Sequence, residues 1–180
     1  MNPVADLISA WRGLAMVVAG KRDAAASFNP TRSGVAIAFL WFVVALLLSA
    51  AAQAAGVGMP SGGQLIAGLA IQSITLAVLA VAVTQSLSFL KLAVPPLAML
   101  VPIIYFTALI QVLAIPLALL GPNVQLIAVF GLAFLIYRTG RVLAEMRGGI
   151  AIAFALLCSM VLVVVPNALY FVMVQFPSPA

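Results

Sequence analysis

Residues 150–174 read IAIAFALLCSMVLVVVPNALYFVMV, a run that holds no charged side chain. As an α-helix that rises about 1.5 Å per residue, this run is longer than the ~30 Å thickness of the hydrocarbon core of a bilayer. A transmembrane β-strand needs only about ten residues and alternates apolar with polar positions, which these residues do not do. The run therefore predicts a helix that crosses a membrane.

The composition of the whole chain agrees with a membrane location. The 180 residues are 66% hydrophobic and only 6% charged, and their mean hydropathy is +1.31. A soluble globule of this size cannot hide so much apolar surface from water. The sequence therefore predicts an all-α integral membrane protein with a single membrane domain.

Four more apolar runs precede residues 150–174, separated by short uncharged loops or proline-containing turns. The predicted spans are 34–53, 64–87, 97–120, 124–140 and 150–174, and Asn29 is expected to cap the first of them. The apolar part of the fourth run, Val124 to Tyr137, makes a helix of only about 21 Å. It spans if the helix continues and Arg138 extends to the headgroups. The alternative is a re-entrant segment, which would return the C-terminus to the side of the N-terminus.

Residues 1–33, before the first span, have a helical pattern of their own. Asn2 and Pro3 are typical of a helix start, and Gly20 is typical of a helix end. Apolar residues between them recur at helical spacing: Val4, Leu7, Ile8, Trp11, Leu14, Ala15 and Val18. Two interpretations are open. The segment is either an amphipathic interfacial helix, with Trp11 as an anchor among the headgroups, or a helix packed on the cytoplasmic end of the bundle.

All the basic residues fall on one side if the chain crosses five times from a cytoplasmic N-terminus. They are Arg12, Lys21, Arg22, Arg32, Lys91, Arg138, Arg141 and Arg147. The loops at 54–63 and 121–123 and the short tail at 175–180 then lie outside the cytoplasm and carry none. This split agrees with the positive-inside rule. The short loops and the pI near 10.2 favour a bacterial inner membrane.

The turn before the last span, YRTGRVLAEMRGG at 137–149, concentrates charge between two apolar runs. On one interpretation its arginines only set the orientation of the chain. On the other, the basic side binds anionic lipid headgroups, because each juxtamembrane basic residue contributes on the order of 1 kcal/mol toward an anionic surface. The candidate headgroup residues are Arg12, Arg138, Arg141 and Arg147. Glu145 is expected to pair with Arg141, four residues earlier.

The predicted spans contain uncharged polar residues instead of ionisable ones. Gln72, Thr75 and Gln111 are the candidates for polar contacts between helices, where each hydrogen bond is worth about 0.6 kcal/mol. The other interpretation is a polar groove for a lipid headgroup or a small neutral solute.

The sequence offers no recognisable catalytic or metal-binding constellation. It contains no histidine and a single cysteine, Cys158, which lies in an apolar run without a base to activate it. We therefore expect a protein that is not an enzyme, with no metal or cofactor and no nucleic-acid partner.

The basic turn and the start of the last span, YRTGRVLAEMRGGIAIAFALL, resemble a known family. Over about residues 90–180 the pattern resembles the Yip1-type multispan membrane proteins and their bacterial relatives. In that family the fourth helix ends in a short charged turn and a small residue opens the fifth. Here Arg138, Arg141 and Arg147, and then Gly148 to Ala151, occupy those places. The resemblance implies a non-catalytic membrane organiser.

The sequence therefore predicts a non-catalytic inner-membrane protein that organises or assembles other membrane proteins or shapes lipid. Its expected partners are anionic lipids and either other membrane subunits or further copies of the chain, and an accessory subunit of a larger complex is one form of this role. The alternative is a small transporter or permeation subunit for a neutral or hydrophobic solute, with Gln72 or Gln111 in its site.

Overall fold

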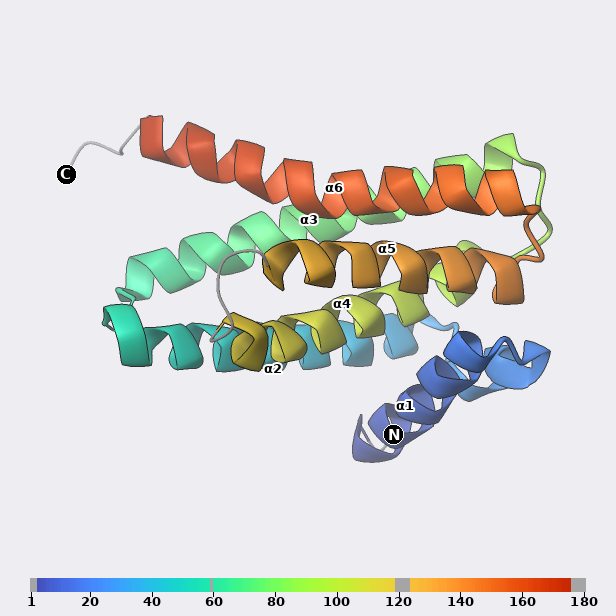
Figure 1. Cartoon of the computed structure of the whole chain (residues 1–180), viewed down its shortest axis with the longest axis horizontal. Helices are drawn as coiled ribbons and strands as arrows, with labels where there is room; N and C mark the ends of the chain where they lie inside the picture. Colours follow the sequence, from blue (N-terminus) through green and yellow to red (C-terminus); the bar gives the residue numbers. More distant parts are fainter. Residues whose placement is uncertain (1–2, 59, 119–123, 176–180) are drawn as a thin grey trace.

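The computed structural model of the chain describes residues 3–58, 60–118 and 124–175, which form helices and no β-strand. The elements, shown in Figure 1, are α1 (Pro3–Ala19), η1 (Arg22–Ser27), α2 (Arg32–Val57), α3 (Gly62–Phe89), α4 (Pro96–Ala118), α5 (Val124–Leu143) and α6 (Gly148–Gln175). Helices α2 to α6 are each long and apolar enough to cross a membrane. This confirms an all-α membrane protein with five spans that follow an N-terminal helix.

Helix α5 is longer than the apolar run that predicted it. It continues past Arg138 to Leu143 and contains 20 residues, which is about 30 Å of helix and enough for a full span. Helix α4 runs unbroken through its two internal prolines. The expected turn at 121–123, the helix start at Asn2 and the residues 176–180 of the tail lie outside the described residues.

The start of α2 differs from its prediction. Thr31, and not Asn29, is the N-cap, because the Thr31 hydroxyl accepts a hydrogen bond from the backbone N–H of Gly34 at 3.2 Å. Asn29 assists from outside the helix: its Oδ1 accepts a bond from the same hydroxyl at 2.8 Å. A threonine placed three residues before the bonded amide satisfies one of the unpaired donors of the first turn.

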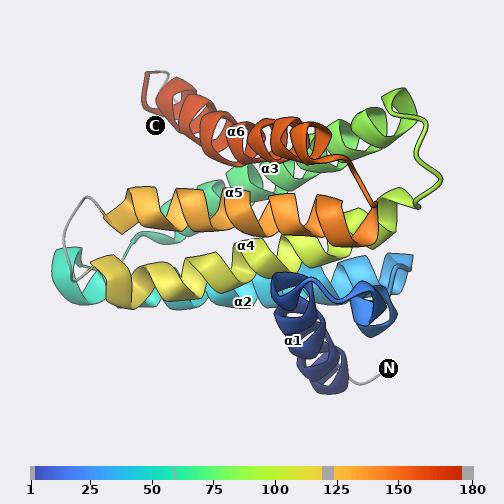
Figure 2. The same ribbon diagram turned by 45° about the vertical axis from the view of Figure 1, so that its right-hand side comes forward.

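Successive spans run in opposite directions, so one end of the bundle collects the start of α2, the α3–α4 turn and the α5–α6 turn. Helix α1 and η1 lie at the same end (Figures 1 and 2). We call it the basic end, because all the lysines and arginines lie there. Helix α4 is central: α2 and α5 pack on its two sides, and α3 packs mainly on α6.

The core is concentrated in the half of the bundle next to the basic end. In α4 every residue from Met99 to Ala108 is buried, whereas none of residues 109–117 is. Helix α3 has buried residues only from Ile71 onward, and the described part of α6 has none after Ser159. The helices therefore pack tightly in the basic half and loosely in the opposite half.

Candidate functional site

Helix α1 carries two apolar stripes that face different surroundings. One stripe is buried against the rest of the protein and consists of Ala10, Gly13, Leu14 and Val17. The other consists of Val4, Ile8, Trp11 and Val18, whose side chains are between 46% and 56% exposed. The structure thus combines the two interpretations of this segment: the helix packs on the bundle and still presents an apolar face that suits a membrane interface.

Two long-range hydrogen bonds hold the two ends of α1. At its C-terminal end, Nη2 of Arg138 in α5 donates to the carbonyl oxygen of Val18 at 2.8 Å. At its N-terminal end, Nε1 of Trp41 in α2 donates to the carbonyl oxygen of Pro3 at 3.2 Å. The guanidinium of Arg138 satisfies a carbonyl that has no partner within the helix and lies at the negative end of the helix dipole.

Gly20 makes the approach of Arg138 possible. The N–H groups of Gly20 and Lys21 donate to the carbonyls of Val17 and Met16, which closes α1 with a Schellman motif. Gly20 has a φ of +78°, a conformation that an L-residue adopts only at a cost. A Cβ atom here would lie 2.5 Å from Nη2 of Arg138. The glycine therefore provides both the turn and the space.

The turn between α5 and α6 is arranged differently from the expected helical ion pair. Glu145 lies beyond the end of α5, in the left-handed region with a φ of +50°, so it cannot face Arg141 as an i, i+4 neighbour would. Arg141 instead donates from Nη1 to the carbonyl of Met146 at 2.8 Å. Glu145 pairs with Arg22 of η1 at 3.5 Å, and both side chains are largely exposed.

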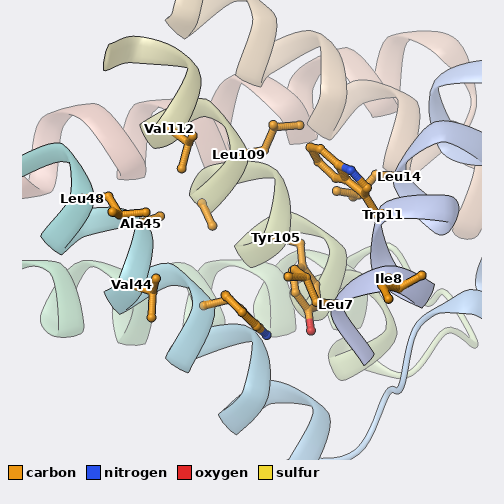
Figure 3. A pocket seen from close by; sticks show the side chains of 12 residues that line it. Leu7, Ile8, Trp11, Leu14, Val44, Ala45, Leu48, Tyr105, Leu109 and Val112 are labelled. Carbon is orange, nitrogen blue, oxygen red and sulfur yellow. The ribbon is translucent and has the colours of Figure 1, made fainter. Parts of the chain in front are cut away.

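An apolar cavity of about 360 Å³ lies between α1, α2 and α4. Its walls include Leu7 and Trp11 from α1, Val44 and Leu48 from α2, and Tyr105 from α4 (Figure 3). The residues on its α1 wall include Ile8 and Trp11, which also belong to the exposed stripe. The cavity is therefore the place where the exposed face of α1 meets the bundle.

The four candidate headgroup arginines differ in their surroundings. Arg12 and Arg147 are exposed. Arg138 and Arg141 each give one guanidinium nitrogen to a backbone carbonyl, and Arg138 is only partly exposed. The structure therefore gives these two a structural role in the fold, and headgroup binding by any of the four stays a prediction.

A second cavity, of about 680 Å³, lies in the loosely packed half between α2, α3, α4 and α6. Gln64 and Gln72 line it from α3, Gln111 from α4, Ser49 from α2 and Tyr170 from α6. No charged side chain is among its lining residues. The structure therefore brings Gln72 and Gln111 to one polar cavity inside the membrane-spanning region.

The expected polar contacts between helices take another form. The hydroxyl of Thr75 donates to the carbonyl of Ile71 in its own helix at 2.8 Å, so it does not bridge two helices. Within the described part of the chain, the carboxamides of Gln72 and Gln111 have no hydrogen-bond partner. They face the same cavity without bonding to each other.

No protein-family model, no curated protein and no solved structure matches this chain. The fold defines the class, a helical membrane protein with five spans and an N-terminal helix packed at one end of the bundle.

Several residues of these sites carry no signal in the sequence. Trp41 and Tyr105 each read as one apolar residue among many in a span, and their contacts with α1 depend on how the spans pack. Tyr170 is a span-end aromatic, a common feature at membrane interfaces. The φ of Gly20 has a sequence signal, because glycine directly after a helix is typical of a left-handed cap.

Proposed function

We propose that this chain is a non-catalytic membrane protein that shapes and organises lipid through α1. The observation that carries the proposal is the second apolar stripe of α1, exposed on a helix whose other apolar stripe is buried against the bundle. The resemblance to Yip1-type proteins is a hypothesis that supports the same role. By the positive-inside rule the basic end faces the cytoplasm, and we propose a bacterial inner membrane as the location.

The fixed position of α1 is what makes shaping of lipid a physical consequence. An amphipathic helix inserts its apolar face some 5–10 Å into the boundary between headgroups and acyl chains, and its binding depends on curvature. A free helix can leave the interface when the lipid resists insertion. Helix α1 cannot do so easily, because Trp41 and Arg138 hold its ends to two spans. It therefore occupies area in one leaflet wherever the protein is present. The added area favours a curved membrane in which that leaflet is on the convex side.

The experiment compares vesicle size at increasing protein-to-lipid ratios. The purified chain is reconstituted into vesicles of phosphatidylethanolamine and phosphatidylglycerol, and diameters are measured by cryo-electron microscopy. The wild-type protein should shift the distribution to smaller diameters, and an Ile8→Gln, Trp11→Gln double variant should not, because it removes the apolar stripe. Ala5→Gln is the matched control, since Ala5 is an exposed residue of the same helix outside the stripe.

Two results would overturn the proposal. One is an identical size distribution for the wild type and the double variant at equal incorporation. The other is a stoichiometric partner protein that copurifies in mild detergent and depends on Ile8 and Trp11, because the stripe would then be a protein interface.

A second candidate function, passage of a neutral solute, is favoured by one observation: Gln72 and Gln111 line the same intramembrane cavity. A transporter of this kind would give solute flux into vesicles above that of empty vesicles, and Gln72→Leu would abolish it. Equal flux with and without the protein would remove this candidate and leave the first unaffected.

A further inference from the structure

The polar cavity lies where the bundle is loosest. The described residues of α2 pack chiefly on α4, and those of α3 pack chiefly on α6 and α4, so α2 and α3 diverge. The residues that line the cavity come from α2, α3, α4 and α6 and from the connection between α2 and α3.

The polar groups in this cavity have donors and acceptors to spare. A glutamine carboxamide offers two N–H donors and a carbonyl acceptor, and a tyrosine hydroxyl offers one donor. Among the described residues, the side chains of Gln72, Gln111 and Tyr170 have no hydrogen-bond partner. An amide in an apolar environment without a hydrogen bond is destabilising. A bound molecule that supplies oxygen acceptors and hydroxyl groups would remove that penalty.

The depth of these groups points to a molecule that enters from the bilayer. Along α3, Gln64 is about 3 Å from Gly62 and Gln72 about 15 Å, at 1.5 Å per residue. The polar groups therefore reach from near the membrane surface to near the middle of the span. Two lining residues in the spans, Leu47 and Tyr170, are 44% and 67% exposed. The cavity is therefore only partly enclosed at the depth of the spans.

The lining also favours ligands that carry no net charge. No ionisable group other than the Tyr170 hydroxyl lines the cavity, and an unpaired charge at this depth in a membrane is expensive. We infer that this cavity binds the head of a neutral lipid that carries carbonyl or hydroxyl oxygens, while the apolar tail extends into the bilayer. A diacylglycerol and an isoprenoid quinone share this chemistry. The inference does not rest on the proposed role of α1, which concerns the other half of the bundle.

The test measures ligand binding by native mass spectrometry of the full chain in detergent. The probes are dioctanoylglycerol and decylubiquinone, with dioctanoylphosphatidylglycerol as the anionic comparator. The wild type should form a one-to-one adduct with at least one neutral probe and bind the anionic lipid more weakly. The Gln72→Leu, Gln111→Leu double variant should lose about tenfold in affinity, because two hydrogen bonds are removed. Gln85→Leu, on an exposed position of α3 outside the cavity, should bind like the wild type.

A cavity-filling variant keeps the test decisive if the double variant does not fold. Gly68 lines the cavity, and a Cβ atom at this position meets nothing within 4 Å, so Gly68→Leu should fold and occupy the site. Gly63→Leu is its control, on an exposed position of the same helix. The inference is overturned if neither neutral probe binds, which would leave a water-filled cavity. It is also overturned if the anionic lipid binds as tightly as the neutral probes. A third contradicting result is that Gly68→Leu binds the neutral probes like the wild type. The neutral probe that binds with the higher affinity shows whether the ligand is a diacylglycerol or an isoprenoid quinone.

Discussion

Arg138 and Val18 are 120 positions apart in the sequence and are joined by a hydrogen bond of 2.8 Å from the guanidinium to the last-turn carbonyl of α1. This bond gives a structural role to a residue whose position near a span end had suggested contact with headgroups. It ties the N-terminal helix to the fourth span. The stability of α1 therefore depends on a residue that lies outside its own segment.

Replacement of Arg138 by Gln should loosen α1 without unfolding the spans. The lost bond is from a charged donor, but the side chain is partly exposed, so we expect a loss of about 1 kcal/mol in the docking of α1. Hydrogen–deuterium exchange of residues 3–19 should become faster. Arg147→Gln is the control, because Arg147 is an exposed arginine of the same turn. Equal protection of α1 in the two variants would show that the bond contributes nothing.

Gly20→Ala should destabilise the same contact from the other side. The left-handed φ costs an alanine about 1–2 kcal/mol relative to glycine, and the new Cβ would displace the guanidinium of Arg138. Thermal unfolding in detergent, followed by circular dichroism, should show a lower midpoint. Gly63→Ala should have the same or a higher midpoint than the wild type, because Gly63 is exposed in a helix. Unchanged unfolding of Gly20→Ala would contradict the described geometry.

Glu145→Gly should stabilise the protein although it removes an ion pair. The pair with Arg22 is between side chains that are 67% and 82% exposed, and such pairs are worth little. Relief of the left-handed φ of Glu145 is worth about 1–2 kcal/mol. The larger entropy that glycine loses on folding offsets about half of this, so the free energy of unfolding should rise by about 0.5–1 kcal/mol. Glu145→Gln removes the charge and keeps the strain, so its stability should stay within about 0.5 kcal/mol of the wild type. A loss of more than this in Glu145→Gln would mean that the ion pair is the stronger effect.

The orientation of the chain can be mapped with single cysteines, because the native Cys158 is fully buried and gives no background. Lys21 lies at the basic end and Gly62 at the opposite end, and both are exposed. In intact cells a membrane-impermeant maleimide should label Gly62→Cys and not Lys21→Cys. In inverted membrane vesicles the pattern should reverse. Labelling of Lys21→Cys in intact cells would place the basic end outside the cytoplasm.

The spans were predictable because their signal is local. Long apolar runs and the grouping of lysine and arginine at alternate span ends require no knowledge of packing. The sequence left open whether α5 continues past Arg138, because a charged residue ends an apolar run whether or not the helix ends there.

The contacts of the sites were not predictable, because they depend on which helices meet. The pair of Gln72 and Gln111 was recognisable as unusual polarity within spans, but their convergence on one cavity depends on the divergence of α2 and α3. The Arg141–Glu145 pair failed as a prediction, because helical spacing is meaningful only while the helix continues, and α5 ends at Leu143.

The attachment of α1 at two ends imposes an order on the synthesis of the protein. Trp41 follows Pro3 by 38 positions, so the N-terminal attachment can form once the first span has been made. Arg138 is translated only after three further spans have begun, so until then the C-terminal end of α1 has no partner for the Val18 carbonyl. A nascent chain therefore passes through a stage in which its first helix is attached at one end only. The second attachment forms when the fourth span has been made.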